Sequence, residues 1–95
     1  MVFILGPIAK EEEFSRAERE IRKNGGIPIN PVKVIYALPE EITNSDFAVI
    51  AFELIRISSE VYLIDGWEKD LIATLEKANA DKMEKKYWRK CNEDD

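Results

Sequence analysis

Two carboxylates in the C-terminal third of the chain have the types and spacing that could do chemistry. Asp70 and Glu76 come after the run Asp65-Gly66-Trp67-Glu68-Lys69, which directly follows a short apolar segment. Six residues of α-helix turn the chain by about 600°, so the two side chains diverge by roughly 120° unless Asp70 precedes the helix. At a helix start, Asp70 is stabilised by the helix dipole and by free backbone N–H groups. We therefore take Asp70 and Glu76 as candidate catalytic residues.

Glu76 is the stronger of the two candidates. It lies between Leu75 and Ala78 on a predicted helix whose flanks are expected to be buried. Burying a carboxylate without a partner is costly, and carboxylates in such places are candidates for a functional role. The alternative interpretation is a solvent-facing glutamate that pairs with its neighbour Lys77.

The composition restricts which reactions are available. The 95 residues include no histidine and one cysteine, Cys91, so the chain cannot build a zinc site or a Ser-His or Cys-His pair. We expect no metal and no cofactor, and the chemistry must use carboxylates, hydroxyls, lysine or arginine. Because Cys91 has no partner for an internal disulfide, the sequence indicates a reducing, cytoplasmic setting.

The charge and the apolar pattern exclude two kinds of partner. Nineteen acidic and fourteen basic residues give a formal net charge of −5, which repels the phosphate backbone of nucleic acids. No apolar run approaches the roughly 18 residues of a membrane-spanning helix. We therefore expect no binding to nucleic-acid polymers or membranes. The basic and aromatic stretch over 82–90 is interpreted as a solvated face, and its pattern leaves open whether it forms a helix or a strand.

Short strands alternate with helices along the chain. Continuous apolar runs predict strands at 2–5, 27–29 and 61–64, with Pro28 placing the second strand at a sheet edge. Helical spacing predicts helices over 11–23, from a cap at Asn44, Ser45 or Asp46 to about 56, and from 69 or 70 onward, with a loop over 32–43. The last helix is expected to carry Leu71, Leu75 and Ala78 on one side.

The order of these elements predicts an α/β fold. Strands joined by helices favour a small three-layer α/β/α sandwich of the Rossmann or flavodoxin-like kind, with a short parallel sheet. We expect one domain over residues 1–90 and a frayed acidic tail over 91–95.

In such a sheet, ligands bind beyond the carboxyl ends of the strands. These ends are predicted at Gly6-Pro7-Ile8, at Asn30-Pro31 and at Asp65-Gly66-Trp67. Gly6 and Pro7 either permit close approach of a ligand or simply turn the chain. Trp67 either stacks on a base or fills an apolar gap, and Tyr62 is interpreted as sheet core.

Several of these segments carry a family resemblance. The runs Ile4-Leu5-Gly6-Pro7-Ile8, Ile29-Asn30-Pro31 and 61–69, followed by Glu76, resemble the nucleoside 2-deoxyribosyltransferase superfamily, especially its small members of unknown function in phage and bacterial genomes. The similarity covers roughly residues 1–80. It implies that Glu76 attacks the anomeric carbon of the sugar, that Asp70 contacts the sugar or its 5′ group, and that Gly6 and Pro7 lie beside the base. It also implies a nucleoside or nucleotide ligand and a homo-oligomer.

The chain departs from that family pattern at three places, of which one is Ser59, where the family has a second aspartate ahead of the third strand. Active members carry an aspartate in the helix before the third strand, whereas positions 50 and 51 here are apolar, so Asp46 or Glu53 would have to replace it. Where the family has a serine and a glycine at the start of the last helix, this chain has Asp70 and Ile72. A carboxylate at that place repels a 5′-phosphate, and a side chain there crowds the approach to the backbone.

Three functions are consistent with the sequence. The first is a protein that binds a nucleoside or nucleotide and cleaves or transfers at its N-glycosidic bond. The second is a non-catalytic relative that binds or sequesters a nucleotide, which the missing helper aspartate favours. The third is an interaction protein whose apolar helix, from Phe47 to Ile55, forms a homodimer or docks on another protein.

Overall fold

Strand β1 (Val2–Leu5) forms the middle of the sheet, and every residue in it is buried. In this computed structural model, which describes residues 1–88, four parallel strands are arranged in the order β2-β1-β3-β4. Strand β2 (Pro28–Ile29) pairs with one edge of β1, and β3 (Glu60–Leu63) pairs with the other from Val2↔Glu60 to Leu5↔Leu63. The predicted α/β fold with a short parallel sheet is confirmed, as is the edge position of Pro28.

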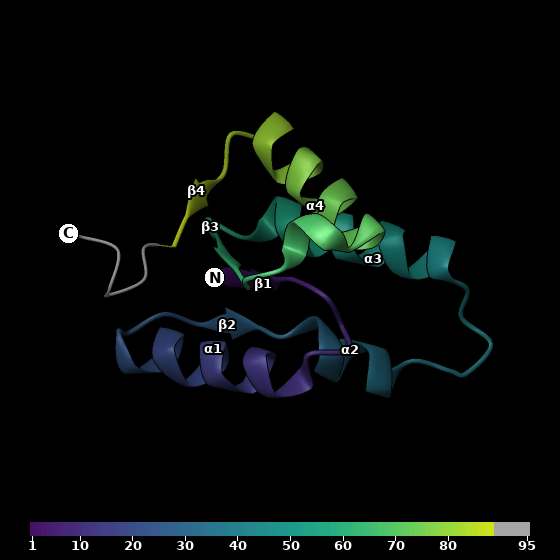
Figure 1. Cartoon of the computed structure of the whole chain (residues 1–95), viewed down its shortest axis with the longest axis horizontal. Coiled ribbons are helices and arrows are strands. Elements are labelled where there is room, and N and C mark those ends of the chain that lie inside the picture. The colour runs from purple at the N-terminus through teal and green to yellow at the C-terminus, as the bar shows by residue number, and fades with distance from the viewer. Residues whose placement is uncertain (89–95) are drawn as a thin grey trace.

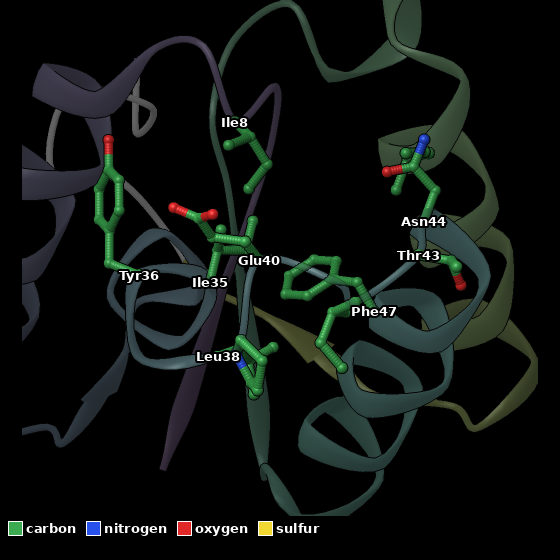
Figure 2. Close-up of a pocket in the computed structure, with 11 residues that line it drawn as sticks. Ile8, Ile35, Tyr36, Leu38, Glu40, Thr43, Asn44 and Phe47 are labelled. Atoms are coloured by element: carbon green, nitrogen blue, oxygen red, sulfur yellow. The ribbon is translucent and has the colours of Figure 1, made fainter.

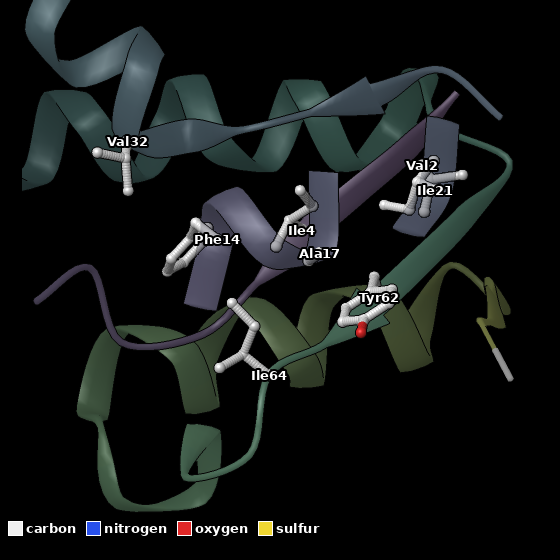
Figure 3. Close-up of a cluster of buried hydrophobic side chains, with 8 residues drawn as sticks. All are labelled: Val2, Ile4, Phe14, Ala17, Ile21, Val32, Tyr62 and Ile64. Carbon is white, nitrogen blue, oxygen red and sulfur yellow. The ribbon is translucent and has the colours of Figure 1, made fainter. Parts of the chain in front are cut away.

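Helices cover both faces of this sheet (Figure 1). Helix α1 (Glu11–Lys23) packs on one face, while α3 (Asn44–Ile57) and α4 (Leu71–Lys82) pack on the other. The α1-side cluster, shown in Figure 3, comprises Val2, Ile4, Phe14, Ala17, Ile21, Val32, Tyr62 and Ile64. The α3-side cluster comprises Phe3, Leu5, Phe47, Ala51, Ile55, Val61, Ala73 and Ala80. Because alternate residues of β1 enter the two clusters, the strand couples both helical layers.

The stretch after β2 is helical, so the prediction of a loop over 32–43 is wrong in its first half. Helix α2 (Pro31–Ala37) begins where the Asn30 side chain accepts a hydrogen bond of 3.0 Å from the Val32 backbone N–H. Pro31 then occupies the first turn, where its missing N–H costs nothing. A capping residue and a proline thus start a helix that its short apolar periodicity did not indicate.

Helix α3 has nearly the predicted length, but its cap is one residue earlier than expected. Thr43, and not Asn44, Ser45 or Asp46, is the capping residue. Its hydroxyl accepts from the Asp46 N–H at 3.1 Å, and the Asp46 carboxylate accepts from the Thr43 N–H at 3.2 Å. This reciprocal pair satisfies two backbone donors at the helix start.

Helix α4 presents a different face from the one expected. Ala73, Glu76 and Ala80 are its buried residues, whereas Leu71 and Leu75 are 75% and 53% exposed. The small alanine side chains let the helix backbone lie close to the sheet, and the larger leucines point outward. The expectation that Leu71, Leu75 and Ala78 form its packing side is therefore wrong.

The chain returns to the sheet after α4, which decides the open question over 82–90 for its described part. Strand β4 (Lys86–Tyr87) pairs in parallel with β3. Lys85, just before it, donates from Nζ to the backbone carbonyls of Arg56 at 2.9 Å and Ser58 at 2.7 Å, where α3 ends. The proposed tail over 91–95, with Cys91, lies outside the described residues. Within residues 1–88, no helix has both the length and the apolar character needed to cross a membrane.

The ends of β1 and β3 approach each other so closely that only glycine fits at position 6. A Cβ atom on Gly6 would lie 2.7 Å from the Cβ atom of Ile64. We expect Gly6→Ala to lower the free energy of unfolding by about 2 kcal/mol, because two backbone-anchored carbon atoms must move apart. Chemical denaturation measures this change.

Gly25→Ala is the matched control, because Gly25 has a φ of +83° and nothing within 4 Å of its would-be Cβ. Gly25→Ala should lower the free energy of unfolding by about 1 kcal/mol, from backbone strain alone. An equal cost for both variants would contradict the close approach of β1 and β3.

Candidate functional site

Glu76 is the most unusual ionisable group among the described residues. Its side chain is on the buried face of α4, and the residue is 4% exposed. No hydrogen bond or ion pair within residues 1–88 involves its carboxyl group. Burial, together with the nearby Asp70 carboxylate, raises the pKa of Glu76 from 4.5 to about 8. The interpretation of Glu76 as a solvent-facing residue is therefore wrong, and the carboxyl is neutral in most molecules at pH 7.

Asp70 is the N-cap of α4 and so precedes the helix. Its Oδ2 accepts a hydrogen bond of 2.9 Å from the Ala73 backbone N–H, and its backbone carbonyl accepts one of 2.8 Å from the Thr74 hydroxyl. Because Asp70 is at the cap and not within the helix, its side chain need not diverge from that of Glu76 by the 120° that two helical positions would impose. The structure thus brings the two candidate carboxyl groups within electrostatic reach of each other.

The loop after β1 packs against the rest of the protein and also contributes one wall residue to a pocket. Gly6 is required by the approach of Ile64, so it serves packing rather than leaving open space. The Pro7 carbonyl accepts a hydrogen bond of 3.0 Å from the Lys10 N–H and holds the turn into α1. Ile8 packs against the α1-side cluster and also lines the pocket described below.

The loop after β3 is held by contacts within the protein. Lys10 donates from Nζ to the Asp65 carbonyl oxygen at 3.0 Å, across the turn at Gly66, whose φ is +94°. Trp67, which begins the short helix η1 (Trp67–Lys69), packs against the α3-side cluster. The Lys77 ammonium group lies 5.2 Å from the centre of its ring. Of the two interpretations of Trp67, the apolar filler is the one that its contacts support.

A pocket of about 540 Å³ opens at the carboxyl edge of the sheet (Figure 2). Its walls come from the loop after β1, the end of α2, the start of α3 and the start of α4. The lining residues are Ile8, Ile35, Tyr36, Leu38, Pro39, Glu40, Ile42, Thr43, Asn44, Phe47 and Ile72. Most are apolar, with Glu40, Thr43 and Asn44 as polar groups on the wall. Sequence reasoning had located this edge but missed most of the wall, because it read α2 as a loop.

The pocket does not include either candidate carboxylate. Of the predicted site residues, only Ile8 lines it. Ile72, four residues before Glu76, is the pocket residue contributed by α4. Residues four apart on an α-helix share a face, so Glu76 lies one turn beyond the pocket wall. No motif or periodicity in the sequence marks Lys10 or the pocket residues of α2.

Comparison with known proteins identifies the family. A family model described as a domain of unknown function (DUF4406) matches residues 2–88. The chain belongs to the DUF4406 family. Comparison with curated proteins and with solved structures finds no match. The DUF4406 match spans the sheet, the pocket and both candidate carboxylates, and the resemblance to nucleoside 2-deoxyribosyltransferases stays a prediction.

The two residues that could replace the helper aspartate have other contacts in this DUF4406 protein. Asp46 completes the capping box at the start of α3, and Glu53 forms an ion pair of 3.0 Å with Arg56. Both side chains are exposed, away from the interior that holds Glu76. Among residues 1–88, no group of three or more Cys, Asp or Glu side chains is placed to hold a metal ion.

The raised pKa of Glu76 links protonation to the stability of the DUF4406 fold. The folded state holds this proton up to about pH 8, whereas the unfolded chain releases it near pH 4.5. The contribution to stability is therefore complete below pH 4.5 and is lost as pH rises to about 8, at roughly 1.4 kcal/mol per pH unit. We expect Glu76→Gln to remove this decline, measured by urea unfolding between pH 4.5 and 8.5.

Glu53→Gln is the control for that measurement, because Glu53 is an exposed glutamate on a neighbouring helix. The Glu53→Gln protein should keep the decline in stability as pH rises. If the free energy of unfolding of the Glu76→Gln protein fell as steeply with rising pH as that of the unaltered protein, Glu76 would not be the group that takes up the proton.

Proposed function

We propose that this protein binds a nucleoside or nucleotide at the carboxyl edge of the sheet and cleaves or transfers at its N-glycosidic bond. Glu76 acts as the nucleophile and Asp70 positions the sugar. The observation that carries the proposal is the Glu76 carboxyl group itself, buried without a partner one helical turn beyond a pocket wall. Such placement destabilises the fold at neutral pH, which favours a chemical role over a structural one.

The pocket suits a ligand with one flat apolar part and a few polar groups. Its volume falls within the roughly 300–1,000 Å³ typical of small-molecule sites. Phe47 and Tyr36 provide aromatic rings on the wall, and Thr43 and Asn44 provide hydrogen-bonding groups. The Tyr36 hydroxyl donates to the Glu11 carboxylate, which holds that ring from the α1 side. A nucleobase with its sugar matches this combination of surfaces.

The proposed reaction requires the ionised form of Glu76. A carboxylate oxygen forms a bond to the anomeric carbon while the C–N bond breaks, and the base leaves with the electron pair and takes up a proton. Water or a second base then displaces the carboxylate from the sugar. Because the pKa of Glu76 is about 8, this carboxylate is a minor species at pH 7 in the free protein.

A second candidate function is binding without turnover. Asp46 and Glu53 both point away from the interior, so neither is placed to serve as the proton-transfer partner of Glu76. A neutral, buried Glu76 then serves only to shape or polarise the site. This reading also predicts saturable nucleotide binding, but no release of base.

An interaction role through the apolar helices remains the third proposal. On α3, Val49 is 64% exposed, and on α4, Leu71 and Leu75 are exposed as well. A homo-oligomer that covers these side chains, in a cytoplasmic protein, is part of the same proposal. Exposed large apolar groups on neighbouring helices are typical of surfaces that other chains cover.

We expect the protein to release free base from at least one compound in a panel of deoxynucleosides and their 5′-monophosphates, followed by chromatography. Since the ionised carboxyl reacts, kcat/KM should rise with pH and level off above about 8. Glu76→Ala should abolish release, whereas Glu53→Ala, on the exposed side of α3, should leave it unchanged.

Binding of the same panel is measured in parallel by calorimetry. Saturable binding with no base released from any compound would reject catalysis and support the second candidate. Base release that persists in the Glu76→Ala protein would show that another group is the nucleophile. If no compound binds or reacts, the nucleoside proposal is wrong and the interaction role stands.

A further inference from the structure

Glu40 is the charged side chain of the pocket wall. None of the other described residues that line the pocket is a lysine, an arginine or an acid. The Glu40 carboxylate has no hydrogen bond or ion pair with another residue of the described chain, 1–88. The Tyr36 hydroxyl, in contrast, already donates to the Glu11 carboxylate. The pocket therefore carries one carboxylate that the protein leaves without a partner and that a bound ligand can satisfy.

A tight turn between α2 and α3 holds Glu40 at the pocket. The Ile42 backbone N–H donates to the Pro39 carbonyl oxygen at 3.2 Å, so Glu40 and Glu41 are the two central residues of the turn. Leu38, before the turn, and Ile42, at its end, both pack against the α3-side cluster. Of the two glutamates, only Glu40 lines the pocket. Packing thus holds the turn, and the turn places one of its two carboxylates at the pocket.

The hydrogen-bonding groups of the pocket lie on two sides of it (Figure 2). In this view the Glu40 carboxylate lies on the side of the Tyr36 ring. Thr43 and Asn44 lie on the other side, with Phe47 in between. A carboxylate accepts hydrogen bonds and donates none, whereas a hydroxyl or an amide both donates and accepts. A flat ligand that spans the pocket therefore meets a pure acceptor at one end and mixed groups at the other.

The chemistry of a carboxylate distinguishes between the nucleobases. Its two oxygens pair best with two N–H groups that lie side by side. Guanine presents such a pair on its base-pairing edge, from the ring N1–H and the 2-amino group. Thymine presents one N–H between two carbonyl oxygens, and adenine and cytosine present an amino group beside a ring nitrogen with a lone pair. In those bases an acceptor would face the second carboxylate oxygen and repel it.

We propose that Glu40 selects the base, and that the pocket takes guanine nucleosides through a paired hydrogen bond between the Glu40 carboxylate and the guanine edge. Selection by Glu40 rests on the proposed function, since it concerns the substrate class of the same pocket. It acts on recognition, so it applies to cleavage of the N-glycosidic bond and to binding without turnover alike. Glu40 is thus a specificity-determining residue.

Deoxyguanosine and deoxyinosine form the test pair, because they differ only in the 2-amino group. Calorimetry with the unaltered full chain should show about tenfold tighter binding of deoxyguanosine, since the extra hydrogen bond is charge-assisted but water competes for the exposed carboxylate. Glu40→Gln should remove this preference, because the amide offers one acceptor oxygen in place of two. Glu41→Gln makes the same substitution beside it in the turn, away from the pocket wall, and should keep the preference.

Binding by the wider deoxynucleoside panel separates selection by Glu40 from the proposed function. If other nucleosides bind and deoxyguanosine binds no more tightly than deoxyinosine, selection by Glu40 is overturned while nucleoside binding stands. A preference for deoxyguanosine that survives in Glu40→Gln, with the fold intact by circular dichroism, would show that another group reads the base. If no deoxynucleoside binds, the proposed function itself fails and selection by Glu40 fails with it.

Discussion

The burial of both faces of strand β1 is the constraint on which the other elements depend. Val2 and Ile4 pack toward α1, and Phe3 and Leu5 pack toward α3 and α4, so neither helical layer can form without the strand. A four-residue strand gives each layer only two anchor side chains. The rest of the core must therefore come from helices that lie very close to the sheet, and the buried alanines of α4 permit that approach.

That close approach explains why an unpaired carboxyl group can be buried in so small a domain. With Ala73 and Ala80 flanking it, Glu76 lies where a helix meets the sheet at short range, and no cation of the described residues reaches it. A leucine or methionine at this position would fill similar volume without the loss of stability that a glutamate brings above pH 4.5. The presence of an acid here is thus not explained by packing, in contrast to Gly6, which the approach of Ile64 requires, and Trp67, which packs against the α3-side cluster.

The sequence predicted those parts of the fold in which local pattern and tertiary packing agree. Strand β1 is a continuous apolar run, and α1 has acids at its start and apolar residues at helical spacing. For both elements the predicted bounds agree with the structure. Helix α2 was missed because seven residues hold too few turns for a periodic signal, so that only Asn30 and Pro31 marked it. The face of α4 was misread because hydrophobicity pointed to the leucines, whereas the space above β1 selects alanine. The burial of Glu76 was left open beside a solvent-facing alternative, because the neighbours that define its helix face were assigned to the wrong side.

The two halves of the candidate site come from different sources. The two carboxyl groups belong to Asp70, the N-cap of α4, and to Glu76 within that helix. Both positions are determined by the local sequence, through the capping residue and the helical spacing. The pocket depends on how α2 and the start of α3 converge, which only tertiary packing determines. Ile72 is the residue that belongs to both halves, since it lines the pocket and shares its helix face with Glu76. The candidate site therefore combines a part that local sequence patterns determine with a part that depends on tertiary packing.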